Sequence, residues 1–433
     1  MVVSQSLYEY KCPDCGGTHP TATVTLPPDY FGKLTPEVKK LIGAVHSETK
    51  PGNSILKLIG GLLTDKTSES YGNIAVDWTT PDAEMLTRLT RDVWSFSAAK
   101  DYQQMRDLTL ALRDENGKPR EFDAFKTEAQ KVCEKYNETW LRTEYDMSIA
   151  SSQSAARWVQ FTKDAKDIPF LEYQTVGDDQ VRASHAVFDG IVRNISDPFW
   201  STHYPPNGWG CRCEAIQAVG ATKDRKDMPN DSPVPEMFRT NLAQTGLIYP
   251  KNHPYYIGIP KAEIRKAIAY LPPENTFLTI NFDKKTAIDI HPLHGDKELS
   301  KNIDACRTLM MHDKKAKLKL LPIINEHDKA IKPNFYPKDY IKKYPNKNGD
   351  VIYKNEVVEF ESPSGSKKSI QHAVGHGIVQ ADKVIIHLPE GIDINHAYNT
   401  VNGHVLAHYP DIKNEIWLMN STELMQYKRQ KRQ

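Results

Sequence analysis

The sequence predicts a multidomain α+β protein, with a largely helical N-terminal part, a loop-rich segment of cysteine, tryptophan and proline, and a small C-terminal α+β domain. Its 433 residues are enough for roughly three domains. Apolar residues recur at helical spacing over residues 79–163, whereas short apolar runs typical of strands alternate with helical segments after residue 296. We therefore divide the chain into an N-terminal region at 1–78, a helical and loop-rich domain at 79–260, a linker at 261–295 and a C-terminal domain at 296–433.

Two long helices are expected in the first half of the chain. The first begins at Thr79–Asp82, where Pro81 suits the first helical turn, and it ends before the polar run 114–117. The second covers residues 121–163, because apolar and aromatic residues recur there every three or four positions. Residues 31–78 give only weak signals.

The C-terminal domain is expected to alternate helices and strands. Apolar patterns predict helices near residues 299–310, 370–380 and 394–405, and strands near 318–324, 384–388 and 415–419. Between them, the residue types at 350–360 predict a hairpin with its turn at Lys354–Asn355.

The composition indicates no strong general attraction to nucleic acid or membrane, since the net charge is +1 and the isoelectric point is about 7.6. The longest apolar run, at 55–63, is interrupted by Lys57 and is too short to span a bilayer. The start of the chain lacks a cationic stretch followed by an apolar run, so no secretory signal peptide is expected. These features favour a cytoplasmic protein without a membrane partner.

Four of the six cysteines form two close pairs, Cys12 with Cys15 and Cys211 with Cys213, which suits a metal site better than a disulfide framework. The C-x2-C spacing of the first pair, followed by glycine, is that of a zinc knuckle. We predict a structural zinc ion bound by all four cysteines, with His185, Cys211 and Cys213 as the alternative ligand set. The remaining alternative is that these cysteines are free or are small buried side chains.

Residues 182–213 predict a rigid, loop-rich structural unit. Pro205 and Pro206 restrict the backbone, and Trp200 and Trp209 supply large rings for a core. His185 and Asp189 are four residues apart, so they could form a catalytic dyad or, as we favour, a structural hydrogen bond that holds the loop. The motif ends in Cys211-Arg212-Cys213.

The order and spacing of this motif resemble the head-morphogenesis domain of the phage Mu F-like family, which contains minor capsid proteins of tailed bacteriophages. The resemblance extends over about residues 80–260: Arg142 and Glu144 match an Arg-Thr-Glu element, and Asn252–Tyr256 resembles the end of the domain. It implies a minor head protein that acts in assembly through contacts with portal and with scaffold or capsid proteins. It also implies a location in the virion and, before assembly, in the host bacterial cytoplasm.

Asp350 and Glu359 flank the predicted C-terminal hairpin. Metal-dependent nucleases of the PD-(D/E)xK type place carboxylates in this way around Mg²⁺, with a lysine two residues after the glutamate. Here that position holds Glu361, so Lys367 or Lys368 would have to replace the lysine.

His372 and His376 lie four residues apart and are expected on one helix face, with Lys367 just upstream. The position after His372 is Ala373, which excludes the zinc-protease motif. Two imidazoles could instead cleave RNA by general acid–base catalysis without a metal. The alternative is a helix-surface pair with no chemistry.

Five pieces of the C-terminal domain resemble the tRNA-nuclease tips of contact-dependent inhibition toxins and the phage barnase–EndoU–colicin–RelE-like nucleases. They are Leu320–Ile324, Gly349–Ile352, Val357–Phe360, Gln380–Ile386 and Ile416–Leu418. That resemblance implies a tRNA substrate and an immunity protein. Two hypotheses result: a minor head protein that carries a ribonuclease-like domain, or a toxin effector that uses the phage module for packaging or delivery.

Overall fold

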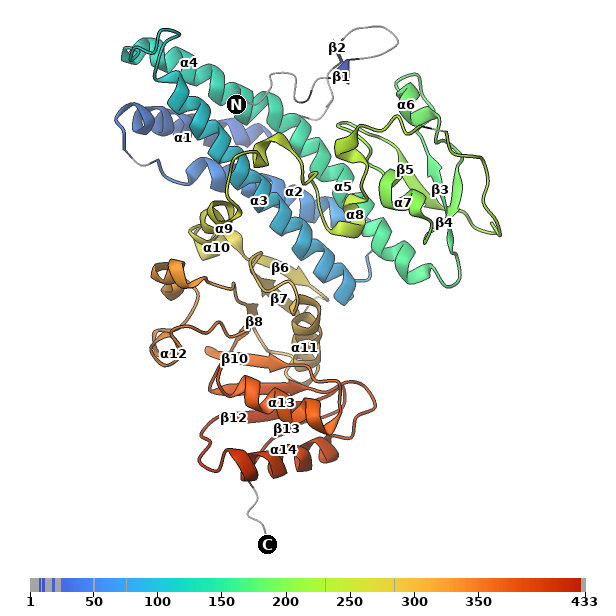
Figure 1. Ribbon diagram of the computed structural model, residues 1–433, viewed down its shortest axis with the longest axis vertical. Helices are drawn as coiled ribbons and strands as arrows, with labels where there is room; N and C mark the ends of the chain where they lie inside the picture. The colour runs from blue at the N-terminus through green and yellow to red at the C-terminus, as the bar shows by residue number, and fades with distance from the viewer. Residues whose placement is uncertain are drawn as a thin grey trace. The chain divides into compact units, whose positions relative to one another are not determined.

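The computed structural model describes Tyr8 and residues 10–11, 18–19, 25–49, 51–74, 76–229, 231–283 and 285–429. These residues fall into two compact units (Figure 1). Unit 1 is drawn from residues 1–77 and 88–268, and unit 2 from 78–87 and 269–433. In the part of the chain that is described, no helix is both long and apolar enough to cross a bilayer.

Unit 1 is built on long helices, drawn in blue to green in Figure 1. They are α1 (Pro28–His46), α2 (Ser54–Gly72), α3 (Thr80–Ala111), α4 (Phe122–Glu134) and α5 (Trp140–Asp164), with a π-helical turn at Lys135–Thr139 that joins α4 to α5. The first turns of α3 are grouped with unit 2. Both predicted long helices are therefore confirmed, whereas α1 and α2 lie in a region with only weak sequence signals.

The remainder of unit 1 is a small antiparallel sheet with short helical turns. Strands β3 (Phe170–Gln174), β4 (Val192–Asn194) and β5 (Glu214–Gln217) form a sheet in the order β4-β3-β5. The short helical segments are α6 (Ala183–Ala186), α7 (Pro198–His203), a 3-10 turn (Glu236–Phe238), α8 (Leu242–Thr245), a second 3-10 turn (Pro254–Tyr256) and α9 (Lys261–Ala269). Near the N-terminus, β1 (Tyr10–Lys11) pairs antiparallel with β2 (Thr18–His19).

Unit 2 contains a mixed eight-stranded sheet in the order β13-β12-β11-β10-β9-β8-β7-β6. Its strands are β6 (Leu278–Asn281), β7 (Ala287–Ile290), β8 (Leu318–Leu320), β9 (Val351–Tyr353), β10 (Glu356–Glu361), β11 (Lys383–His387), β12 (Glu415–Met419) and β13 (Leu424–Gln426). The helices are α10 (Pro273–Thr276), α11 (Leu299–His312), a 3-10 segment (Glu326–Asn334), α12 (Lys338–Lys343), α13 (Lys367–Gly377) and α14 (Ile394–His408).

The segment 261–295 is not a linker, which corrects the expectation from the sequence. It forms α9, α10, β6 and β7, and β6 and β7 complete one end of the sheet. Each strand has only four residues, too few for a recognisable alternating pattern. They pair with each other, and β7 also pairs with β8.

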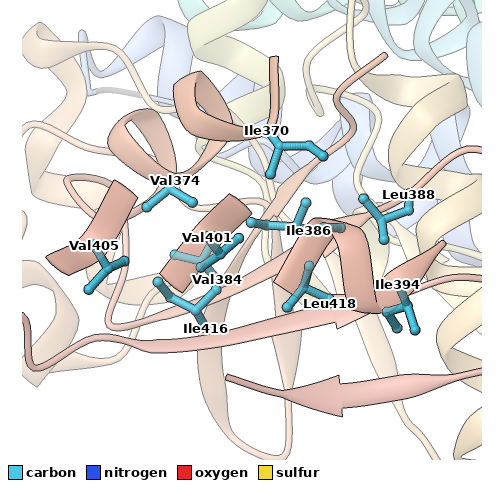
Figure 2. Packing of buried hydrophobic residues seen from close by; sticks show 11 residues of the cluster. Ile370, Val374, Val384, Ile386, Leu388, Ile394, Val401, Val405, Ile416 and Leu418 are labelled. Atoms are coloured by element: carbon cyan, nitrogen blue, oxygen red, sulfur yellow. The ribbon is translucent and has the colours of Figure 1, made fainter. Parts of the chain in front are cut away.

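A hydrophobic layer fixes α13 and α14 against one face of the sheet (Figure 2). Ile370 and Val374 of α13 and Val401 and Val405 of α14 are fully buried. They pack against alternate residues of β11 and β12, namely Val384, Ile386, Ile416 and Leu418. This layer is the reason why the helix that carries His372 and His376 keeps a fixed position over the sheet.

The predicted hairpin turn is also present, with Lys354 at φ 51° and Asn355 at φ 64°. Two consecutive positive φ values define the two-residue turn that matches the twist of antiparallel strands. The turn sets the register of β9 on β10, in which Val351 lies opposite Val358.

Helix α2 approaches α3 closely at Gly60. A Cβ atom built there would lie 2.2 Å from Cζ3 of Trp94, whereas one built at the neighbouring Gly61 has no atom within 4 Å. We expect Gly60→Ala to destabilise the protein by about 1–3 kcal/mol, because the Trp94 ring must move. Gly61→Ala is the matched control and should stabilise it by about 0.5–1 kcal/mol through helix propensity.

Denaturant unfolding of both variants, followed by tryptophan fluorescence, measures this difference. Equal effects of the two substitutions would show that α2 and α3 are not in this close contact.

Candidate functional site

Residues 182–213 form a loop-rich motif beside the small sheet. The Pro205–Pro206 peptide bond is cis. Asp197 caps α7 by accepting a hydrogen bond from the backbone N–H of Phe199 at 2.8 Å. Trp200 is buried and donates its indole N–H to the Arg193 carbonyl. Trp209 is also buried, and its ring makes edge contacts with Tyr8, Phe238 and His253.

This motif brings His185, Cys211 and Cys213 together. Nδ1 of His185 lies 3.6 Å from Sγ of Cys211 and 3.5 Å from Sγ of Cys213. His185 and Cys211 are buried, and Cys213 is partly buried. The alternative ligand set of the sequence analysis is thus a real spatial cluster. Cys12 and Cys15 lie outside the described residues, so the four-cysteine site stays a prediction.

The suggested pairing of His185 with Asp189 is wrong. The Asp189 carboxylate instead accepts hydrogen bonds from the backbone N–H and the hydroxyl of Thr175, at 2.7 and 2.8 Å. It therefore holds the loop after β3, while Nδ1 of His185 faces the two sulfurs. Arg212 points away from the cluster and donates two hydrogen bonds to Asp178.

A buried polar centre lies in the helical part of unit 1, around Glu144 of α5. Oε1 accepts hydrogen bonds from the hydroxyls of Tyr8, at 2.9 Å, and Tyr255, at 2.8 Å. Oε2 accepts from the ammonium group of Lys100 in α3. Glu144 and Lys100 are both essentially without solvent exposure, so each charge depends on the other for its stability.

His253 completes this polar centre, and its partners define its tautomer. Nδ1 accepts a hydrogen bond from the backbone N–H of Tyr255 at 3.2 Å, so it carries no hydrogen. Nε2 lies 3.1 Å from the Tyr8 oxygen, whose own hydrogen is given to Glu144. Nε2–H is therefore the donor, and the ring is neutral. Burial, together with the nearby Lys100 cation, lowers the pKa of His253 to about 3.

In unit 2, a carboxylate cluster forms where β9 and β10 pair. The β9–β10 register ends with Val351 opposite Val358, and the backbone N–H of Asp350 also donates to the Val358 carbonyl. The Asp350 carboxylate is close enough to Glu359 to act on it electrostatically. Glu361 lies two residues further along β10, and its Oε1 is 2.5 Å from Nδ1 of His376. Glu359, Glu361 and His376 offer ligand atoms within 4.8 Å of one another.

Burial raises the pKa of both central carboxyl groups, and neighbouring carboxylates add to the effect. The pKa of Asp350 is raised to about 8, even though its carboxylate accepts hydrogen bonds from Asn302 and from the Phe360 backbone. The pKa of Glu359 is raised to about 11 by burial and by Asp350. Oε2 of Glu359 has no hydrogen-bond partner among the described residues.

The other predicted catalytic residues, His372 and Lys367, lie in different surroundings. The rings of His372 and His376 are stacked on the surface of α13 with centroids 6.1 Å apart. Lys367, at the start of α13, instead lines a cavity of about 440 Å³ shared with His396, His404 and His408 of α14. A second cavity of about 270 Å³ borders Asp350 and includes Glu298 and Lys347.

Several site residues were not singled out from the sequence. Tyr8 and Lys100 gave no local signal, and the segment Asn252–Tyr256 was noted only for its resemblance, because these contacts are long-range: Tyr8 lies 136 positions from Glu144 and 245 from His253. Glu298 was also missed. The Glu361–His376 contact could have been suspected from two titratable residues on adjacent elements, although their approach depends on how α13 packs.

Comparison with known proteins places the motif in a family context. Residues 97–216 match the family described as "Phage Mu protein F like protein", which confirms the resemblance for this segment. The chain is 37% identical over 83 residues to the "Putative capsid assembly protein F" of Escherichia phage Mu, covering 19% of each chain. It is 40% identical over 73 residues to the "Mu-like prophage FluMu F protein" of Haemophilus influenzae, covering 17% of this chain and 18% of that protein.

The chain thus spans less than a fifth of the length of these curated relatives. No solved structure matches it. The family match ends at residue 216, so it does not bear on unit 2.

The neutral state of His253 leads to a pH prediction. Its folded pKa of about 3 is below the value of about 6.5 expected for an unfolded chain, so the unfolded state binds the extra proton in this interval. This group's contribution to stability is complete above about pH 6.5 and is lost as the pH falls toward 3. His253→Asn keeps an acceptor for the Tyr255 N–H but removes the titration.

Unfolding free energies of the wild type and His253→Asn, measured between pH 4 and 7.5, test this assignment. The wild type should lose about 1.4 kcal/mol more per pH unit than the variant below pH 6. Parallel pH profiles would show that His253 is not held neutral in the folded state.

Proposed function

We propose that the chain acts in the assembly of a tailed-phage or prophage head, as a minor head protein that contacts the portal and the scaffold or capsid proteins. The support is the match of residues 97–216 to the Mu F-like family and to a phage Mu protein named for capsid assembly. On this proposal the protein is found in the virion and, before assembly, in the bacterial cytoplasm.

The chemistry of unit 1 suits a protein-binding role. Its most deeply buried ionisable groups, Lys100, Glu144 and His253, are bonded to one another and to tyrosine hydroxyls. Groups in such an arrangement hold helices and loops together, since their donors and acceptors are already engaged. Unit 1 therefore offers a rigid surface to its partners.

We infer a second candidate function for unit 2, the cleavage of RNA phosphodiester bonds. The observation that favours it is the buried Oε2 of Glu359, which has no hydrogen-bond partner among the described residues and whose carboxyl group is affected electrostatically by Asp350. Carboxylate oxygens are the ligands that Mg²⁺ prefers, and a bound cation would stabilise both groups in their charged form. Asp350, Glu359 and Glu361 would hold the ion, and His376 would orient Glu361.

A bound divalent ion would polarise a phosphate oxygen and help to activate water. The competing mechanism needs no metal and uses the exposed His372 and His376 as acid and base. In either case the substrate class would be RNA, with tRNA the first to test. A toxin of this kind would require an immunity protein in the producing cell and could use the phage particle for delivery.

The assembly proposal is tested in a phage or prophage whose copy of the gene is interrupted. Few complete heads are expected, and the full-length chain supplied in trans should restore them. Trp209→Ala removes a buried ring at a cost of about 3 kcal/mol or more and should fail to restore assembly. Glu359→Gln, in unit 2, should restore it as well as the wild type.

Heads are counted by sedimentation and electron microscopy. Normal head numbers without the gene would contradict an assembly role.

The nuclease proposal is tested by incubating the full-length protein with total tRNA, with and without EDTA. If the carboxylates hold Mg²⁺, cleavage should disappear in EDTA and in Glu359→Gln but persist in His372→Ala. Cleavage that persists in EDTA and is lost in His372→Ala would assign the chemistry to the histidines. Intact tRNA in every condition would leave unit 2 without this activity.

A further inference from the structure

We propose that the loop-rich motif of unit 1, residues 182–213, contains a zinc site in which His185 Nδ1, Cys211 Sγ and Cys213 Sγ are the protein ligands. This inference goes beyond the proposed functions, because neither head assembly nor RNA cleavage requires a metal at this place. It also differs from the four-cysteine site expected from the sequence, since it assigns the histidine as a ligand.

The first argument is the distance between ligand atoms. In a tetrahedral site with Zn–S of 2.3 Å and Zn–N of 2.0–2.1 Å, a sulfur and a nitrogen ligand lie about 3.5 Å apart. The two S–N distances here are 3.6 Å for Cys211 and 3.5 Å for Cys213. All three ligand atoms lie within 4.8 Å of one another. One ion can therefore reach the three atoms without a change in the backbone.

The second argument is that a single hydrogen bond of His185 Nδ1 cannot account for its short contacts with both sulfurs. A ring nitrogen has either one N–H or one in-plane lone pair, so Nδ1 of His185 can form a good hydrogen bond with only one sulfur. Both sulfurs nevertheless lie at the same short distance from it. A cation at the centre of the three atoms interacts with all of them at once.

The third argument is that the backbone is shaped to hold the cluster. His185 lies in α6, and the two cysteines immediately precede β5. Gly208, just before Trp209, passes close to the ring: a Cβ atom there would lie 3.8 Å from Nε2 of His185 and 3.1 Å from Nη1 of Arg182. Arg182 in turn donates to the Trp209 carbonyl. The loop is thus fixed on both sides of the ligands.

With three protein ligands, a tetrahedral zinc ion would complete its coordination with a water molecule. The ion would tie the turn at α6 to the start of β5, which are separated by 26 to 28 positions in the chain. The Trp209 ring, two residues before Cys211, packs against Tyr8 and His253. The ion would therefore also help to hold this ring against the buried polar centre.

The test uses the purified full-length protein and its zinc content by elemental analysis. The wild type should contain about one zinc per chain, and His185→Gln and Cys213→Ser should each fall to below about 0.1. Cys133→Ser is the matched control, because Cys133 is a buried cysteine outside the cluster, and it should keep the metal. The double variant Cys12→Ser/Cys15→Ser should keep it too.

Zinc that is lost from the double variant but retained in His185→Gln would overturn the proposal in favour of the four-cysteine site. A folded wild type that neither contains zinc nor binds added zinc or cobalt would also overturn it.

A second measurement covers the case in which the variants fail to fold. Thiol alkylation of the wild type, mapped by mass spectrometry, should label Cys211 and Cys213 at least tenfold more slowly with zinc than after chelation, since metal-bound thiolates are shielded. Cys133 and Cys306 are buried and give the internal reference. Equal labelling of Cys211 and Cys213 in both states would contradict metal ligation.

Discussion

The buried charge pair of Lys100 and Glu144 is the interaction on which unit 1 depends. Removing two charges from water is costly, and the cost is recovered only when every donor and acceptor finds a partner. Here the carboxylate has three donors, the Lys100 ammonium group and the hydroxyls of Tyr8 and Tyr255. Because these donors come from α3, from the N-terminal segment and from the turn at Pro254–Tyr256, one side chain fixes three separate parts of the chain.

The carboxylates of unit 2 differ from Glu144, because not every acceptor there has a donor among the described residues. Asp350 has two donors, whereas Glu359 keeps an oxygen without one. The hydrophobic layer under α13 and α14 must stabilise the sheet strongly enough to hold such groups inside (Figure 2). Hydrophobic packing does not explain why an acidic oxygen without a hydrogen-bond partner is buried. Ion binding is the simplest physical explanation.

The sequence predicts those features of the structure that depend on local pattern. The long helices were predictable because apolar residues repeat over many turns, whereas Gly60 and Gly61 in α2 and Pro36 in α1 weakened the same signal. The pairing of Val351 with Val358 follows from the Lys354–Asn355 turn, since a two-residue turn sets the register of the hairpin. Strands β6 and β7 were missed because each has only four residues, too few for a recognisable alternating pattern.

The same division applies to the candidate sites. Spacing alone suggested that His185 could join Cys211 and Cys213, but only the folded loop shows Asp189 bonded to Thr175 instead of His185. The polar centre around Glu144 could not be found in this way, because Tyr8 and His253 are 245 positions apart. No local pattern encodes a contact between residues so distant in the chain.

The position of Tyr8 also constrains the order of folding during synthesis. Tyr8 is made 245 positions before its partner His253. At translation rates of about 5–20 residues per second, roughly 12–50 s pass between the two, and the polar centre cannot close before then. Once Glu144 has been made, its carboxylate lacks the Tyr255 donor until the end of this interval. Unit 1 therefore completes its core only after most of its chain has been made, and its nascent helices must stay soluble until then.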